Sequence, residues 1–111
     1  MGIKVCKFGG TSMASAQTIM AVANIVNADE ERRYVVVSAP GKRFSGDIKV
    51  TDLLYQCSDE FEAGNIAAFK ETFEKIRARF MSIETEIGKS LNIKAGLDEA
   101  EDAILSGAGR D

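Results

Sequence analysis

The feature that most constrains the fold of this chain is a pair of glycines, Gly9-Gly10, between an apolar run and a helical pattern. The apolar run, Ile3 to Cys6, is typical of a strand. Glycines at such a junction let backbone N–H groups approach an anion closely, and a helix N-terminus adds partial positive charge. Lys7, at the strand end, is placed to neutralise a phosphoryl group. The alternative is an ordinary strand–turn–helix corner with a surface lysine, since the spacing fits neither a Walker A loop nor a dinucleotide fingerprint.

The next segments complete a βαβ pattern. Within residues 14–28 the apolar positions recur on one helix face, at Ile19, Val22, Ala23 and Val26. Tyr34 to Val37 is a continuous apolar run, which is typical of a strand covered on both faces. We therefore expect parallel strands at 3–8 and 34–37, joined by a right-handed crossover through the helix.

Two motifs in this order resemble a known family. Lys7-Phe8-Gly9-Gly10-Thr11-Ser12 resembles the opening of aspartate kinases, which belong to the amino-acid kinase family. The second motif resembles the aspartate kinase segment that runs from a second strand, through a Ser-Ala turn, to a threonine at a helix start: Val35-Val36-Val37-Ser38-Ala39-Pro40-Gly41, then Val50-Thr51-Asp52-Leu53-Leu54. The resemblance covers essentially all 111 residues. It implies an α/β fold, an incomplete three-layer α/β/α sandwich.

The rest of the chain predicts a long helical hairpin. A second helix starts near Val50, and Gly64 is placed to end it, with Asn65 as the cap of the next helix. The third helix carries a heptad seam of Ile66, Phe69, Phe73, Ile76, Phe80, Ile83 and Ile87. The short connection favours packing of this seam against the preceding helix, and the alternative is a coiled-coil oligomerisation face. A last short helix is expected at 97–105.

Composition excludes several classes of function. The net charge of −3 gives no indication of a nucleic-acid partner, and no apolar run reaches membrane-spanning length. The absence of histidine removes Ser-His and Cys-His catalysis. Cys6 and Cys57 have no metal or redox spacing, so they read as buried free thiols, which suits the cytoplasm.

The resemblance implies phosphoryl transfer from ATP, with Mg²⁺, to the side-chain carboxylate of L-aspartate. This reaction is the first step towards lysine, threonine and methionine, and its product is an acyl phosphate. A carboxylate acceptor is already ionised at neutral pH and needs no general base, so the missing histidine does not count against it. Catalysis then consists of positioning and charge neutralisation.

The first motif carries the implied catalytic and ATP-binding residues. By resemblance, Lys7 contacts the ATP phosphates and stabilises the transferring group. Gly9 and Gly10 would donate backbone N–H bonds to phosphate, and Phe8 would supply backbone and packing. The alternative for Lys7 is a solvated lysine at a strand end.

Four hydroxyl groups have two interpretations each. Thr11 and Ser12 either meet the ATP phosphates or cap the following helix. By resemblance, Ser38 lies beside aspartate and the γ-phosphate, and its alternative is a turn hydroxyl that bonds its own backbone. Thr51 matches the family threonine that binds substrate aspartate, and its alternative is a simple N-cap.

The 38–51 loop is locally basic because of Lys42, Arg43 and Lys49. These side chains either attract anionic substrates or are simply solvated. The loop is longer than in several aspartate kinases, which affects the placement of Ser38 relative to Thr51. No residue is assigned to a metal, since the nucleotide phosphates usually supply much of the coordination of Mg²⁺.

The resemblance implies that residues 1–111 correspond to an N-terminal part of the kinase catalytic domain. The resemblance implies that the rest of that domain and regulatory ACT domains follow, and that Asp111 falls just before an Arg-Gly-Glu stretch that helps bind the amino acid. We therefore expect the isolated chain to have no kinase turnover.

Two alternatives to aspartate kinase remain. One is another acyl-phosphate-forming amino-acid kinase, and the other is a helical self-association module. A mass that depends on concentration would favour the module, whereas nucleotide binding that is lost on changing Lys7 would favour the enzyme. The expected partners are ATP, L-aspartate and further copies of the same protein, without nucleic acid or membrane.

Overall fold

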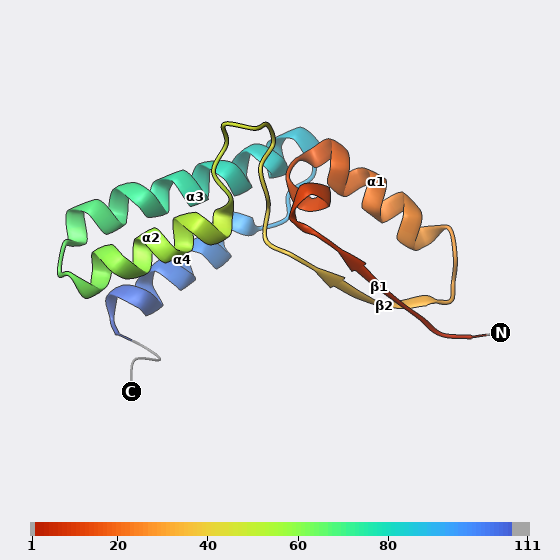
Figure 1. The fold of residues 1–111 in the computed structure, drawn as a ribbon, viewed down its shortest axis with the longest axis horizontal. Coiled ribbons are helices and arrows are strands. Elements are labelled where there is room, and N and C mark those ends of the chain that lie inside the picture. Colours follow the sequence, from red (N-terminus) through yellow and green to blue (C-terminus); the bar gives the residue numbers. More distant parts are fainter. Residues whose placement is uncertain (1, 108–111) are drawn as a thin grey trace. The chain divides into compact units, whose positions relative to one another are not determined.

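The computed structural model describes residues 2–107, which form two compact units with a boundary between Tyr55 and Gln56. Asp111 lies outside the described residues. Figure 1 shows the elements, which follow in chain order: β1 (Lys4–Phe8), the 3₁₀ helix η1 (Gly10–Met13), α1 (Ala16–Asn27), β2 (Arg32–Val37), α2 (Val50–Glu62), α3 (Ile66–Ile87) and α4 (Ile93–Leu105). None of the helices in residues 2–107 combines the length and the apolarity needed to cross a membrane.

The first unit contains the expected parallel strand pair. β1 and β2 form a two-stranded sheet in which Val5 pairs with Tyr34 and Phe8 pairs with Val37. α1 connects the two strands and contacts β2, and the Arg32 guanidinium donates to the backbone carbonyl of Ile25 at the end of this crossover. The predicted βαβ start is confirmed.

The first helix begins later than its apolar pattern suggests. The short helix η1 lies between the glycine turn and α1, and Ser15 is the N-cap of α1. The Ser15 hydroxyl accepts from the Thr18 amide at 3.3 Å, and the Thr18 hydroxyl accepts from the Ser15 amide at 3.2 Å. This reciprocal pair is a capping box. The interpretation of Thr11 and Ser12 as the helix cap is therefore wrong, because both lie inside η1.

The strand at 34–37 is not covered on both faces, so that expectation is wrong for this chain. The four residues are between 40% and 60% exposed, and Val5 on the neighbouring strand is 70% exposed. The physical reason is that the sheet of the described residues has two strands only. An apolar strand run needs further elements on either side before it is buried.

The predicted helical hairpin is formed by α2, which ends in the second unit, and α3, which lies wholly in it. α2 ends at a turn in which Gly64 has φ of +76°, a conformation that favours glycine. The Asn65 side chain then caps α3 by accepting from the Ala68 amide at 3.1 Å. The two helices meet through an edge-to-face contact of Phe61 and Phe69, whose ring centroids are 5.8 Å apart.

Most of the heptad seam of α3 is buried. The buried members are Phe69, Phe73, Ile76 and Ile83, while Ile66 is 38% exposed and Phe80 and Ile87 are half-buried. Thr72, beside the seam, donates to the Glu60 carboxylate on α2 at 2.6 Å. Burial of this seam favours the hairpin over a coiled-coil face.

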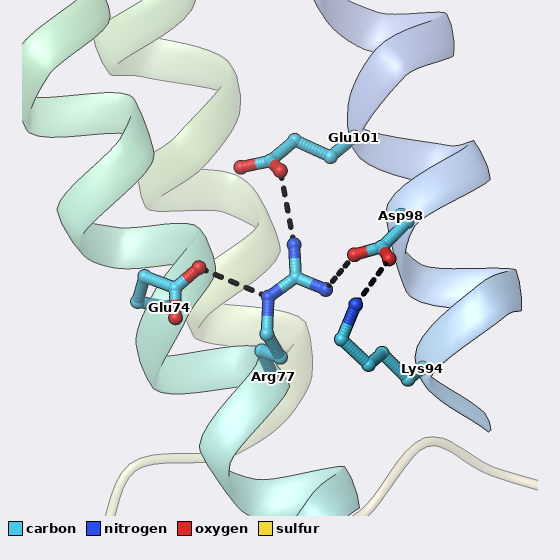
Figure 2. A network of polar contacts seen from close by, with 5 residues as sticks. All are labelled: Glu74, Arg77, Lys94, Asp98 and Glu101. Carbon is cyan, nitrogen blue, oxygen red and sulfur yellow. Dashed lines mark hydrogen bonds and ion pairs between the residues drawn. The ribbon is translucent and has the colours of Figure 1, made fainter.

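The last helix begins at Ile93, four residues before the expected start. Its N-terminus is capped from another helix, because the Glu84 carboxylate on α3 accepts from the amides of Leu91 and Ile93 at 2.8 and 3.3 Å. Figure 2 shows that Arg77 of α3 also binds Asp98 and Glu101 of α4. A cap that comes from a distant residue leaves no local sequence signal.

Candidate anion-binding pocket

The first unit contains a pocket of about 320 Å³, which we call the turn pocket. Three segments line it: the start of η1, the loop after β2 and the first turn of α2. The lining residues are Gly10, Thr11, Ser38, Ala39, Pro40, Gly41, Lys42, Lys49 and Thr51.

The pocket lies where both parallel strands end. The Ser38 amide donates to the Phe8 carbonyl at 3.1 Å, which extends the pairing of the strands by one step. The chain then leaves each strand in a turn, and the two turns come together. Ligands of open α/β sheets bind at this carboxyl edge of the strands.

Two glycines hold the turns together. The Gly41 amide donates to the Gly10 carbonyl at 2.8 Å. A Cβ atom on Gly41 would lie 2.6 Å from the Gly10 carbonyl carbon, and one on Gly10 would lie 3.3 Å from the Ala39 oxygen. This contact leaves no room for a side chain on Gly41. In the sequence, Gly41 stands out only as the end of the second motif, and nothing local to it indicates the contact with Gly10.

The loop between Pro40 and Val50 is closed at its base. Its neck is a hydrogen bond from the Val50 amide to the Pro40 carbonyl, at 3.0 Å. Inside the loop, the Asp47 carboxylate accepts from the Arg43 amide at 3.0 Å and from its guanidinium at 2.6 and 3.0 Å. Hydrogen bonding to Arg43 holds the pKa of the Asp47 carboxyl well below its usual range. The loop is thus an ordered structure with its own ion pair.

The pocket presents hydrogen-bond donors and positive charge. The Gly10 and Thr11 amides make no hydrogen bond within residues 2–107, as expected for the first residues of a helix. Thr11, Ser38 and Thr51 contribute hydroxyl groups to the lining. The ammonium groups of Lys42 and Lys49 add positive charge, and the lining includes no carboxylate. This chemistry suits an anion.

The structure brings together part of the predicted site. Gly10, Thr11, Ser38 and Thr51 all line the turn pocket, although they come from three separate segments. Thr51 lies inside α2, which begins at Val50. The alternative interpretation of Thr51 as the N-cap of this helix is therefore wrong.

The other predicted residues flank the pocket without lining it: Lys7, Phe8, Gly9 and Ser12. Lys7 is exposed, pairs with Val36 in the strand register, and has no carboxylate partner among residues 2–107. A Cβ on Gly9 would meet nothing within 4 Å. The roles expected for these residues stay predictions.

The described residues hold no group of three or more His, Cys, Asp or Glu that could bind a metal ion. In the loop beside the turn pocket, the Asp47 carboxylate is engaged by Arg43. The chain therefore offers hydroxyl, amide and ammonium groups at this site.

Three comparisons place the chain among known proteins. Residues 2–104 match the model of the family described as "Amino acid kinase family". The chain is 43% identical over 91 residues to Aspartokinase 3 of Bacillus subtilis, covering 80% of this chain and 20% of that protein. It is 39% identical over 89 residues to an aspartokinase of Chlamydia trachomatis, covering 80% and 18%.

A solved structure agrees with these matches. The crystal structure of aspartate kinase from Clostridium acetobutylicum matches with a TM-score of 0.89 and 36% identity, over 98% of this chain and 25% of that chain. The predicted fold class is thereby confirmed. The chain spans about a fifth of the length of the curated relatives described above.

Proposed function

Because this chain belongs to the amino acid kinase family, we propose that the protein containing it transfers the γ-phosphoryl group of ATP to the side-chain carboxylate of L-aspartate. The observation that carries the proposal is the turn pocket, where free amides, hydroxyls and lysines of separate segments meet at the carboxyl ends of parallel strands. Similarity to aspartokinases supports aspartate as the acceptor. The product, aspartyl phosphate, would enter lysine, threonine and methionine synthesis.

In this proposal the glycine turn receives the phosphates of ATP. The Gly10 and Thr11 amides are without acceptors in the described chain, so each can donate to a phosphate oxygen. Mg²⁺ would reach the site with the nucleotide and neutralise phosphate charge there, held largely by phosphate and water oxygens. Gly9, Phe8 and Ser12 complete the proposed ATP-binding stretch.

Lys7 is the proposed catalytic residue. Its ammonium group has no carboxylate partner in residues 2–107, whereas Lys4 on the same strand is held by Asp29 at 2.6 Å. An unpaired cation at the end of the strand can stabilise the negative charge of the phosphoryl group during its transfer. No proton has to be removed from the acceptor, because the aspartate side chain is ionised at neutral pH.

The acceptor amino acid is proposed to contact Ser38 and Thr51. Both hydroxyls line the same pocket as the glycine turn, so a carboxylate near them would lie close to a phosphate bound at Gly10 and Thr11. Such an arrangement lowers the barrier mainly through proximity and orientation. A family member with another carboxylate acceptor is the second candidate, because the matching model is described as that of the amino acid kinase family and names no acceptor.

We place the proposed reaction in the cytoplasm. Cys6 and Cys57 are both free thiols, but the expectation that both are buried is wrong for Cys6, which is half-buried because its strand belongs to a sheet of two strands. Burial raises the pKa of the Cys57 thiol. A buried, protonated thiol is a poor nucleophile, and free thiols suit a reducing compartment.

Replacing Lys7 tests the proposal. In a longer protein that contains these 111 residues, Lys7→Met should lower kcat for ATP-dependent aspartate phosphorylation by about 10²–10³-fold, the typical loss when a group that stabilises transition-state charge is removed. Lys4→Gln is the matched control, since Lys4 lies on the same strand but is engaged by Asp29. Equal activity of the Lys7 variant and the unchanged protein would contradict the assignment.

A further inference from the structure

We propose that Lys42 and Lys49 bind the anionic ligand of the turn pocket through its carboxylate or phosphate oxygens. Both residues line the pocket, and they come from opposite ends of the closed loop. The inference deepens the proposed function and rests on it, because the ligand would be one of that reaction's two anionic substrates.

The two lysines lack carboxylate partners of the kind that Lys4 and Lys94 have. Lys4 binds Asp29 at 2.6 Å and Lys94 binds Asp98 at 2.9 Å. Within residues 2–107, Lys42 and Lys49 form no ion pair, and the pocket lining includes no acidic residue. Their charge is therefore available to a bound anion.

The loop itself explains why this charge stays uncompensated. Asp47 is the acidic residue between the two lysines in sequence, and its side chain is only 9% exposed. Three hydrogen bonds from Arg43 occupy this carboxylate. Asp47 is thus bound to Arg43, and the ammonium groups of the two lysines stay available to an anion in the pocket.

The neck of the loop brings both lysines to one place. The hydrogen bond between Val50 and Pro40 closes the loop. Lys42 follows Pro40 by two residues, and Lys49 directly precedes Val50. Residues seven apart in the sequence therefore flank the same pocket, next to the hydroxyls of Ser38 and Thr51.

The lysines would supply positive charge, which the amides and hydroxyls of the lining do not. Amides and hydroxyls can orient an anion but carry no net charge, while two ammonium groups offset the charge of a dicarboxylate or a polyphosphate. One unit charge a few ångströms from an anion changes affinity by about fivefold in a solvent-exposed site. This contribution falls with added salt.

The test is a binding measurement on the 111-residue chain, by NMR of the Gly10, Thr11, Ser38 and Gly41 amides. Tripolyphosphate and L-aspartate are titrated separately, which distinguishes the phosphate source from the carboxylate source. We expect at least one probe to shift these amides, and Lys42→Gln with Lys49→Gln to weaken its binding by about 25-fold. Lys89→Gln, with the same charge change outside the pocket lining, should bind as the unchanged chain does.

A charge-keeping variant completes the design. Lys42→Arg with Lys49→Arg should retain binding and its salt dependence. Unchanged affinity in the double Gln variant, or no binding of either probe to the unchanged chain, would overturn the inference. Either result leaves the proposed function to be judged by phosphoryl transfer in the longer protein, so the two failures are distinguishable.

Discussion

Gly10 and Gly41 join the two turns of the pocket through their backbones. The 2.8 Å hydrogen bond between them fixes the distance from the glycine turn to the loop that carries Ser38. Because the contact is between main-chain atoms, it does not depend on side-chain rotamers. The spacing of the proposed phosphate and acceptor positions therefore rests on this pair.

Gly41→Ala should separate these turns. Its Cβ would lie 2.6 Å from the Gly10 carbonyl carbon, which main-chain atoms cannot accommodate without a shift. We expect the free energy of unfolding to fall by about 1–3 kcal/mol, as for other overpacked sites. Gly46→Ala is the control, since its Cβ would meet the Phe44 ring at an ordinary 3.8 Å. Denaturant titration of both variants checks this, and equal stabilities would argue against the contact.

At the residue scale, the sequence indicated several residues of the pocket, but it did not indicate the contacts between them. Gly10 could be selected from the glycine turn itself, and Ser38 and Thr51 from the resemblance of their segment to aspartate kinases. The need for glycine at position 41 arises from the approach of a segment 31 residues away. No local pattern encodes such an approach.

At the scale of elements, helix starts were the least predictable features. α1 is capped by Ser15 after an intervening turn of 3₁₀ helix, and α4 is capped by Glu84 from α3. Apolar periodicity shows which face of a helix is buried, but it does not locate the cap. The hairpin turn was predictable because Gly64 and Asn65 act locally.

Ser15→Ala should destabilise the chain by about 1 kcal/mol, the usual cost of losing an N-cap. The Ser15 hydroxyl accepts from the Thr18 amide, and alanine leaves that donor without its partner. Ser12→Ala is the matched control, because Ser12 lies in η1 and caps no helix. Thermal unfolding measures both, and a larger loss for Ser12→Ala would contradict the observed helix start.

The attachment of α4 to α3 should weaken in acid. Lys94 and Arg77 hold the pKa of Asp98 below its usual range. A lowered pKa contributes stability above the unfolded value of about 4, and this contribution is lost as the pH falls through the folded value. Figure 2 shows the contact of Arg77 with Asp98 between the helices and the contact of Lys94 with Asp98 within α4.

Amide hydrogen exchange, corrected for its intrinsic pH dependence, tests this attachment. Protection of α4 should fall below about pH 4 in the unchanged chain. Asp98→Asn should show less of this change and lower protection at neutral pH. Asp102→Asn, on the same helix, should behave as the unchanged chain. A flat pH profile of protection in the unchanged chain would contradict the role of the network.

At the scale of the whole molecule, the most unusual feature is a pair of apolar strands that is largely exposed. Residues 34–37 are apolar and at least 40% exposed, as is Val5. Sequence showed the strands and their apolar character, but it could not show which surfaces would be covered. Coverage depends on elements that pack on the sheet, and the described residues provide two strands.

The purified chain should therefore bind the hydrophobic dye ANS and increase in mass with concentration through the exposed sheet and not through the α3 seam, because unpaired strand edges and apolar faces associate. Val36→Lys should reduce both effects. Leu91→Lys is the control, since Leu91 is 49% exposed but outside the sheet, and Val36 is 52% exposed. Analytical ultracentrifugation that finds a monomer at all concentrations, without dye binding, would contradict this expectation.

The proposed chemistry is tested most directly by trapping the acyl phosphate with hydroxylamine. A longer protein that contains these 111 residues should form aspartyl hydroxamate from ATP and L-aspartate, with little product from L-glutamate, and the chain alone should form none. Product from L-glutamate in preference to L-aspartate would move the assignment to another acyl-phosphate kinase. No hydroxamate from any carboxylate would contradict the account.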